Sequence, residues 1–276
     1  MSKIIEKRYE TLLLFDVKNG NPNGDPDAGN MPRIDYYTNH GIISDVCIKR
    51  KVRNHVQLVK GDCEGYKIYV TEGVVLNHQH ELAYKALNLT PESKKMPDDK
   101  EMAQAVTKFM CDNFYDIRTF GAAMSNEVNA GIVRGPVQFC FAESIDPIEP
   151  VCLSITRMAV TKEKDEKKER TMGDKWIVPY ALYKMEGHIS VPLAEKTGFA
   201  EDDLDLLFDA LINMFEHDRS AARGEMTARK LFVFEHNSKL GNARAQQLFE
   251  AIKVEKKDAE KPARKYSDYK VEVDYN

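Results

Sequence analysis

The segment Gly41–Val59, GIISDVCIKRKVRNHVQLV, combines a helical apolar pattern with a dense group of cations. Ser44 is a residue type that caps helix starts, and Asp45 falls in the first turn, where the helix dipole favours negative charge. At about 100° per residue, four apolar residues fall on one narrow stripe: Ile48, Val52, Val56 and Val59. The segment therefore predicts one helix with a face that packs on a core.

Four cations fall on an arc beside the apolar stripe: Lys49, Arg50, Arg53 and Lys60. Like charges this close repel one another unless something negative lies above them. The backbone of a nucleic acid suits such a row, because its phosphates recur at a regular spacing. A solvated charged face is the commoner explanation of the helical pattern taken alone.

The composition limits the kinds of protein that this chain can be. With 276 residues, of which 42% are hydrophobic, the chain is long enough for a sizeable core. Its formal net charge of −4 means that any nucleic-acid site is a local basic groove. Five cysteines without a CxxC pair argue against a disulfide framework and structural zinc, and they fit a reducing cytosol. Because neither a signal peptide nor a membrane-spanning apolar run is found, we expect a cytoplasmic protein with no membrane contact and no cofactor.

Alternation and periodicity predict the order of the other elements. Tyr9–Val17 is apolar on both alternations, which is typical of a central strand buried on both faces. Further strands are predicted at Tyr66–Val70, Val137–Ala142, Val151–Val160, His188–Leu193, Lys230–His236 and Tyr269–Val273, and helices at His78–Leu89, Asp98–Asn113, Asp202–Phe215 and Gly241–Ile252. Without insertions the order is strand, helix, strand, strand, helix, strand, which is the split βαβ order of a ferredoxin-like or RRM-like sheet. We therefore predict an α+β fold.

Two segments stand outside this order. Residues 61–115 are predicted to form a mostly helical insertion. Thr161–Lys175, TKEKDEKKERTMGDK, holds many charges and one apolar residue, so it contributes nothing to a core. A solvated loop is the simpler explanation; the alternative is a protruding hairpin with strand-like flanks, in which Met172 and Trp176 wedge against bases. The predicted main domain comprises residues 1–60, 116–160 and 181–276, and the predicted arm comprises residues 161–180.

The segment Ile117–Pro136, IRTFGAAMSNEVNAGIVRGP, is predicted to be an ordered loop rich in glycine. Glycine often serves only turns with positive φ. Alternatively, three glycine N–H groups and two arginines approach phosphates closely: Gly121, Gly131, Gly135, Arg118 and Arg134. This second interpretation gains support if the segment lies beside the cationic helix.

The loop Asn19–Asp35, between the first strand and the helix, invites a metal hypothesis. Its asparagines resemble the first ligands of a calcium loop, but Asn30 stands where that loop needs a bidentate glutamate. Four carboxylates are the candidates to hold Mg²⁺ for phosphoryl chemistry: Asp16, Asp25, Asp27 and Asp35. Turn formation explains the same residues more simply, and the sequence contains no HExxH, GxSxG or Walker motif. We therefore predict neither a metal site nor a catalytic site.

Six strings together resemble a known family. They are NPNGDPD at Asn21–Asp27, SDVCIKRKVRN at Ser44–Asn54, RTFG at Arg118–Gly121, NAGIVRGPVQ at Asn129–Gln138, SITR at Ser154–Arg157 and TMGDKWIVPYALY at Thr171–Tyr183. They span most of the chain, and their combination is specific, although NPNGDPD or RTFG alone is weak. The chain resembles the CRISPR-associated Cas seven family, the backbone subunits of type I-C Cascade surveillance complexes.

This resemblance implies an RRM-like palm, a helical fingers insertion and a thumb β-hairpin. Members of the family stack head-to-tail as a helical filament along the CRISPR RNA. Their thumbs displace a nucleotide at regular intervals, and the segments between these positions pair with target DNA. The implied partners are CRISPR RNA, target DNA through guide pairing, further copies of the chain, and Cascade subunits of the Cas-five and Cas-eight types. The implied RNA-binding residues are Ser44, Lys49, Arg50, Arg53, Arg118, Gly121, Arg134, Gly135 and Met172, the last as the wedge.

We therefore predict a non-catalytic CRISPR RNA-binding subunit. Two alternatives stay open. The first is a Mg²⁺-dependent ribonuclease that uses loop aspartates such as Asp16, Asp25 or Asp27. The second is an assembly protein without nucleic acid, which would form ordered filaments without RNA.

Overall fold

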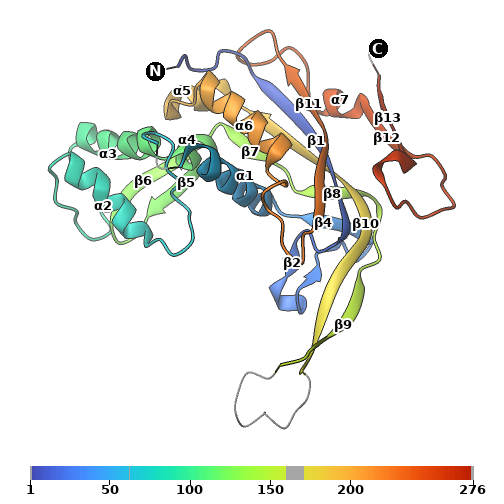
Figure 1. The fold of residues 1–276 in the computed structure, drawn as a ribbon. Coiled ribbons are helices and arrows are strands. Elements are labelled where there is room, and N and C mark those ends of the chain that lie inside the picture. The colour runs from blue at the N-terminus through green and yellow to red at the C-terminus, as the bar shows by residue number, and fades with distance from the viewer. Residues whose placement is uncertain (1, 62, 160–170, 275–276) are drawn as a thin grey trace.

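The main sheet of the protein is antiparallel and has seven strands. A computed structural model describes residues 2–61, 63–159 and 171–274 (Figure 1). The strands β11 (Glu225–Glu235), β1 (Tyr9–Gly20), β10 (Thr171–Ile189), β8 (Ala142–Pro147) and β4 (His40–Ile43) lie side by side in this order. Two more strands, β7 (Val137–Phe139) and β9 (Val151–Arg157), also pair with β10. The fold is thus a mixed α/β fold with a central antiparallel sheet.

The prediction of a central strand at Tyr9–Val17 is confirmed. β1 lies between β10 and β11, and its side chains alternate between two separate cores. Leu13 and Phe15 belong to one hydrophobic cluster, whereas Leu12 and Leu14 belong to another, and all four are essentially fully buried. An apolar run on both alternations is what such a two-sided burial requires.

Helices cover one face of the sheet. They are α1 (Asp45–Lys60), α5 (Val191–Thr197) and α6 (Glu201–Asn213), the last confirming the predicted helix at Asp202–Phe215. Ile48, Val52 and Val56 of α1 are fully buried, as the apolar stripe predicts. Val59 is 53% exposed, so its place on the stripe was wrong: the last turn of α1 runs beyond the core.

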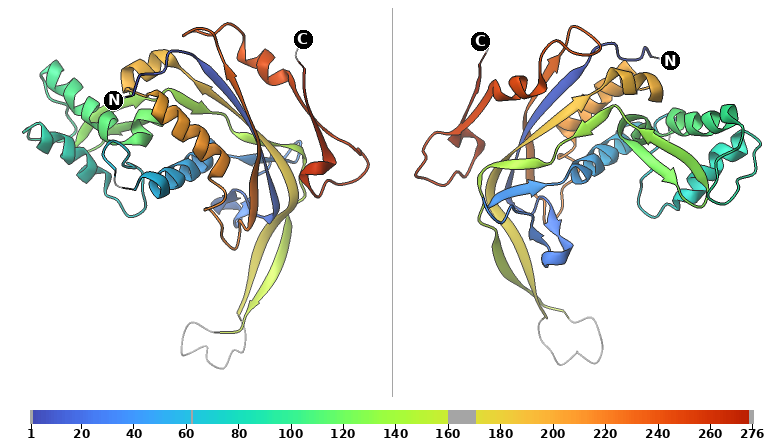
Figure 2. Two further views of the ribbon diagram at one scale, coloured as in Figure 1. Left: turned by 45° about the horizontal axis from the view of Figure 1, so that its top comes forward. Right: turned by 180° about the vertical axis from the view of Figure 1, so that it is seen from behind.

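The C-terminal segment covers the opposite face of the sheet. It comprises α7 (Ala245–Glu250), β12 (Ile252–Lys256) and β13 (Tyr269–Val273), with a short 3₁₀ turn at Tyr266–Asp268. Both views of Figure 2 place this segment on the far side of the sheet from α1 and α6. Phe249, Ile252 and Tyr269 are buried against Leu12 and Leu14 of β1. The predicted helix at Gly241–Ile252 is therefore shorter than expected, because its end becomes strand β12.

A second body of helices and a hairpin projects from one end of the sheet. It contains α2 (Leu76–Ala86), α3 (Lys100–Asn113), α4 (Tyr115–Phe120) and a hairpin of β5 (Gly121–Ser125) and β6 (Asn129–Arg134). These elements share their own hydrophobic cluster. The predicted helices are confirmed, with Asp99 rather than Asp98 accepting the capping hydrogen bonds of α3. The boundaries of a separate insertion domain stay a prediction.

Two local predictions in this region were wrong. The glycine-rich segment is α4 followed by the β5–β6 hairpin, not a loop. Tyr66–Val70 is not a strand: within the part of the chain that the structure describes, its pairing is limited to one isolated bridge, between Lys67 and Phe114. Alternation in a five-residue segment is too short a signal to separate a strand from an extended loop.

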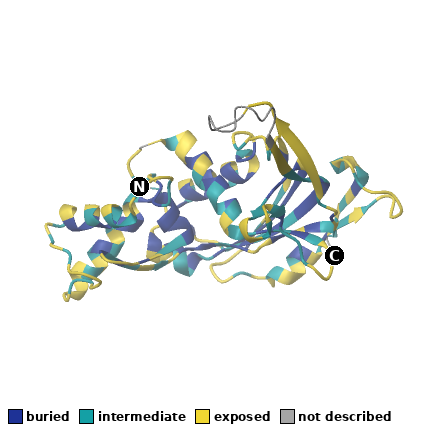
Figure 3. Cartoon of the chain, turned by 90° about the horizontal axis from the view of Figure 1, so that it is seen from below, coloured by how far each residue is buried: buried dark blue, intermediate teal, exposed yellow. Residues whose placement is uncertain are grey.

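A two-stranded arm projects from the sheet. β9 pairs with the first part of β10, from Arg157 opposite Thr171 to Val151 opposite Ile177. Every residue of β9 is exposed, which Figure 3 shows as a yellow ribbon leaving the buried centre. These pairs support the hairpin alternative for the arm, while its tip at residues 161–170 lies outside the described residues.

β10 is longer than any strand that the sequence predicted. It continues from the arm through Trp176–Tyr180 to Ile189, and Pro192 then lies in the first turn of α5. The predicted strand His188–Leu193 was therefore wrong beyond Ile189, and β8 was missed. The predicted strands at Lys230–His236 and Tyr269–Val273 are confirmed within β11 and β13. Among the described residues, no helix is long and apolar enough to cross a membrane.

Candidate nucleic-acid interface

Lys49 and Arg53 of α1 converge on one aromatic ring. The Lys49 ammonium lies 5.6 Å and the Arg53 guanidinium carbon 5.4 Å from the centre of the Phe120 ring. Phe120 ends α4 and is followed directly by Gly121 of β5. The structure therefore brings the glycine segment beside the cationic helix, which was the condition for its nucleic-acid interpretation.

The row of unpaired cations predicted on α1 was wrong. Lys49 Nζ lies 2.8 Å from Asp45 Oδ2, and Arg53 Nε lies 2.7 Å from Asp116 Oδ2. Both cationic side chains are only 12% exposed. The sequence pattern placed the cations on one arc correctly. It overlooked the pairing of Lys49 with Asp45, one turn earlier in α1, and it does not report that Asp116 of α4 lies beside Arg53.

Asp116 is the centre of this arrangement, and sequence reasoning missed it. Its buried carboxylate also accepts hydrogen bonds from the backbone N–H groups of Tyr69, at 2.8 Å, and Val70, at 3.1 Å. Arg50 Nη1 donates to the carbonyl oxygen of Val70 at 2.7 Å. Within residues 2–61, 63–159 and 171–274, no carboxylate forms an ion pair with Arg50. Of the three α1 cations here, Arg50 therefore keeps the least compensated charge.

The start of α1 is held by the loop that precedes it. Asn23 Oδ1 accepts from the backbone N–H of Ser44 at 3.0 Å and from its hydroxyl at 3.1 Å. Ser44 is thus the residue before the helix, as predicted, but its hydroxyl does not cap a helix N–H. The loop contains the short strands β2 (Gly24–Asp25) and β3 (Met31–Pro32) around a 3₁₀ turn at Pro26–Ala28. The loop and the start of α1 are thus joined by hydrogen bonds from Ser44 to Asn23.

Arg118 is not placed to contact RNA, which corrects its assignment. Its side chain is 8% exposed and forms an ion pair with Asp203, whose side chain is 4% exposed. Nε and Nη2 donate to the two oxygens of this carboxylate at 2.8 and 2.7 Å. Nη1 donates to the carbonyl oxygen of Cys111 at 2.8 Å, and Nη2 to that of Gly65 at 3.0 Å. All three guanidinium nitrogens thus bind protein acceptors, so we remove Arg118 from the candidate interface.

Gly121 and Gly135 are required by a close approach within the chain itself. A Cβ on Gly135 would lie 2.3 Å from the carbonyl carbon of Phe120 and 2.4 Å from the nitrogen of Gly121. A Cβ on Gly121 would lie 2.4 Å from the carbonyl oxygen of Val133. Gly121 also has a φ of +81°, which glycine adopts without strain. These contacts account for both glycines without a phosphate.

Arg134 faces a different surface from the α1 cations. Its backbone pairs with Gly121, but its exposed side chain lines a pocket of about 1010 Å³ between α3, β6 and α5. Lys100, Lys108 and Lys196 also line this pocket. The predicted site residues therefore divide into two cationic surfaces rather than one.

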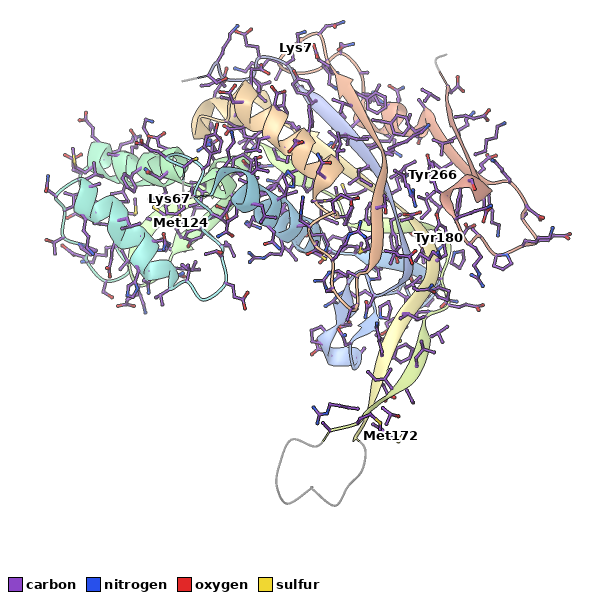
Figure 4. The ribbon with its side chains drawn as sticks, viewed as in Figure 1. Lys7, Lys67, Met124, Met172, Tyr180 and Tyr266 are labelled. Atoms are coloured by element: carbon purple, nitrogen blue, oxygen red, sulfur yellow. The ribbon has the colours of Figure 1, made fainter. Side chains whose placement is uncertain are left out.

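Met172 lies on the arm, far along β10 from the sheet centre (Figure 4). Its side chain is 75% exposed, and its backbone is opposite Thr156 of β9. Trp176 is half-buried nearer the root of the arm. An exposed methionine at this point fits the wedge, and the wedge role of Met172 stays a prediction.

The loop carboxylates proposed for Mg²⁺ do not form a cluster. Asp16 accepts from the Tyr180 hydroxyl and from Arg229 Nε, each at 2.9 Å, and burial followed by the charge of Asp16 raises the pKa of Tyr180. Asp25 binds Arg33 at 3.2 Å. The backbone N–H of Tyr37 lowers the pKa of Asp35. Over the described ranges, no group of three or more His, Cys, Asp or Glu side chains is arranged to hold a metal ion.

The fold and this surface define a class of protein: a mixed α/β chain with a covered antiparallel sheet, a projecting helical body, a two-stranded arm and a cationic helix. The family model for CRISPR-associated protein Cas7 matches residues 7–274, so the chain belongs to the Cas7 family. The resemblance deduced from the six strings is thereby confirmed, while the type I-C subtype stays a prediction.

Individual relatives agree with this family. A CRISPR-associated protein Cas7 from Haloferax volcanii is 28% identical over 219 residues, which are 72% of this chain and 62% of the relative. The chain thus spans less than two thirds of that protein. A chain of a solved CRISPR RNA-guided surveillance complex, in a pre-nicking state, superposes with a TM-score of 0.53 at 15% identity and covers 82% of this chain and 77% of its own length. At 15% sequence identity, the similarity between the two chains is a similarity of fold.

Proposed function

We propose that this protein is a non-catalytic CRISPR RNA-binding backbone subunit of a type I Cascade complex. The observation that carries the proposal is the convergence of Lys49 and Arg53 on the Phe120 ring, in a chain of the Cas7 family. Arg50 of the same helix lies at the Val70 carbonyl oxygen. We call these three cations, together with Phe120, the α1 corner. Two carboxylates, Asp45 and Asp116, accompany the three cations, so the α1 corner keeps an excess of positive charge that suits a phosphate backbone.

We also propose that the sheet is an RRM-like palm. Four strands in chain order, β1, β8, β10 and β11, are connected through α1 before β8 and through α6 before β11. Their spatial order, β11-β1-β10-β8, is the order expected for a split βαβ sheet. The helical body with α2 and α3 would be the fingers, and the β9–β10 arm the thumb.

The covered sheet directs RNA to the helix side. An RRM commonly stacks bases on aromatic residues of its open sheet face. Here α7, β12 and β13 bury that face, with Leu12, Leu14 and Leu182 beneath them. The backbone of the guide RNA would instead run over the start of α1 and the α1 corner. The bases of the guide would then stay free to pair with target DNA.

In this proposal the arm extends the interaction to a second copy. Copies stack head-to-tail on one RNA, so many weak, salt-dependent contacts add up through avidity. The arm of one copy reaches the RNA on the next, with Met172 as the wedge. Subunits of the Cas-five and Cas-eight types would complete the assembly.

The test is binding of single-stranded guide RNA by a Lys49→Gln, Arg50→Gln variant. Arg53 is left unchanged, because its removal would leave the buried Asp116 unpaired. The matched control is Lys85→Gln, Lys95→Gln, which removes the same charge from side chains that are 73% and 70% exposed on the helical body. We expect the slope of log affinity against log salt to fall by about 0.7 for each lost phosphate contact in the first variant only.

Two results would count against the proposal. Equal salt slopes for both variants would remove the α1 corner from the interface; a parallel Arg134→Gln variant then tests the pocket between α3 and α5. Cleavage of guide RNA in Mg²⁺ that Asp25→Ala abolishes would overturn the non-catalytic part and restore the ribonuclease alternative.

A further inference from the structure

Cys140, His188 and Glu10 form a chain of contacts that RNA binding does not use. Cys140 follows β7, and its Sγ lies 3.9 Å from Nε2 of His188 on β10. Nδ1 of the same imidazole is hydrogen-bonded to a carboxylate oxygen of Glu10 on β1. Cys140 is exposed, His188 is 40% exposed, and Glu10 is fully buried. The order thiol, imidazole, buried carboxylate is that of an activated nucleophile, its base and the group that orients the base.

The buried carboxylate fixes the tautomer of the imidazole. Burial raises the pKa of Glu10, but the hydrogen bond from His188 and the positive charge of Arg8 lower it below its usual value. A carboxylate at Nδ1 requires a proton on that nitrogen. Nε2 then carries its lone pair toward Cys140 Sγ. The thiol needs this base, because burial and the nearby Glu186 raise the pKa of Cys140.

A small pocket adjoins the imidazole. Its volume is about 230 Å³, and Arg8, His188, Ser190 and Lys239 contribute to its walls. Arg8 is ion-paired with Glu10, and Lys239 is ion-paired with Glu195. The Lys239 side chain is 46% exposed, so its ammonium is the cation that a ligand with carboxylates can reach. His188 also packs against Phe249 of the cluster on the far side of the sheet from α1. The imidazole thus lies on the side of the sheet opposite α1, whereas Cys140 follows Phe139, whose ring packs on Phe120 with centroids 5.8 Å apart.

We propose that Cys140 is a covalent modification site that reacts with small anionic disulfides, with His188 as its general base and Glu10 as the positioning residue. In the reaction His188 Nε2 takes the thiol proton while Cys140 sulfur attacks one sulfur of R–S–S–R. The S–S bond of the reagent breaks and a Cys140–S–S–R bond forms. The leaving RS⁻ takes the proton from the imidazolium, so Cys140 is oxidised and one half of the reagent is reduced to RSH.

The experiment compares cysteines within one molecule. Cys63 and Cys152 are also exposed and serve as internal references. The full-length protein is treated with oxidised glutathione, and each cysteine peptide is followed by mass spectrometry over time. An ordinary thiol such as that of Cys152 is only a few per cent thiolate near neutral pH. Because His188 takes the proton of Cys140, we expect Cys140 to react about tenfold faster than Cys152. Equal rates for the two would overturn the proposal.

Variants then assign the roles. His188→Gln should remove the advantage of Cys140 while Cys152 keeps its rate, which also reports that the fold is intact. Free imidazole added to a His188→Ala variant should restore part of the lost rate, an effect that a purely structural role of His188 would not give. An unchanged Cys140 rate in His188→Gln contradicts the assignment.

Two further variants separate positioning from binding. Glu10→Gln should slow Cys140 only when His188 is present; equal slowing in the His188→Ala background would show that Glu10 acts through the fold instead. Lys239→Gln should slow the reaction with oxidised glutathione but not with neutral iodoacetamide. Equal effects on both reagents would overturn the preference for an anionic disulfide.

Discussion

Replacing Arg118 by alanine distinguishes a structural role from the RNA contact that the sequence suggested. The substitution removes the guanidinium that neutralises Asp203 and also leaves the carbonyl oxygens of Cys111 and Gly65 without their donor. Asp203 itself is needed where it is, because its carboxylate accepts from the backbone N–H of Ala200 at the start of α6 at 3.0 Å. The variant thus buries an uncompensated charge beside a helix start.

The size of the effect follows from this burial. Removing one partner of a buried ion pair costs about 3–5 kcal/mol, because the remaining charge stays desolvated. A chain of this size loses about 2–4 °C in melting temperature per kcal/mol, so the melting temperature should fall by roughly 6–20 °C. Replacing both Arg118 and Asp203 by leucine should recover part of the loss, since no unpaired charge then remains.

The assay is urea unfolding of RNA-free protein followed by circular dichroism. Arg134→Ala is the matched control, because Arg134 was predicted as an RNA contact on the same grounds but is exposed. Its free energy of unfolding should stay within about 0.5 kcal/mol of the parent. If Arg118→Ala unfolds like Arg134→Ala and loses guide RNA instead, the structural explanation of Arg118 is refuted.

Three more predictions follow from single sites. Gly135→Ala should destabilise the protein by about 2 kcal/mol or more, because its Cβ meets backbone atoms of Phe120 and Gly121, whereas Gly173→Ala, with its nearest atom 3.9 Å away, should lie near zero in the same unfolding assay. Burial lowers the pKa of His80, so below about pH 6.5 the unfolded chain binds a proton that the folded chain does not. The free energy of unfolding should therefore decrease as the pH is lowered below this value, and a His80→Gln variant should lose this pH dependence in urea titrations. Met172→Ser should leave stability within about 0.5 kcal/mol but abolish the regular spacing of nuclease footprints on bound guide RNA, and unchanged spacing would remove the wedge role.

Local patterns predicted the elements whose burial is simple. Tyr9–Val17 is apolar on both alternations because β1 packs on two cores, and α6 has a strong helical stripe because one of its faces is buried against the sheet. β8 was missed because the polar Ser144 is buried and Asp146 is half-buried, where it accepts a hydrogen bond from the Tyr269 hydroxyl, so apolar and polar residues do not alternate along Ala142–Pro147. Its strand state comes from pairing with β4 and β10.

The sequence predicted which cationic residues lie at the candidate site, but it did not predict which carboxylates pair with them. The helical period placed Lys49 and Arg53 on one side of α1, and the structure agrees. Asp45 pairs with Lys49 within α1, at a spacing of four residues that the sequence shows. The pairing of Arg53 with Asp116 and of Arg118 with Asp203 depends on how the chain folds back, since Arg118 and Asp203 are 85 residues apart. Charge spacing along a sequence does not report such partners, so an arginine in a glycine-rich segment resembles a ligand contact until its surroundings are known.

The continuity of β10 has a mechanical consequence. This strand has 19 residues and no break between the arm and Ile189, so it is a rod of about 60 Å. One end is clamped by hydrogen bonds to β1 along nearly the whole length of that strand. Because the same strand continues from the arm into the sheet, no loop that could act as a hinge lies between them in β10. A sideways force on the arm is therefore transmitted to the strands that pair with β10. In an assembly that uses the arm as a connector, the twist of β10 would set the handedness and the pitch of the assembly.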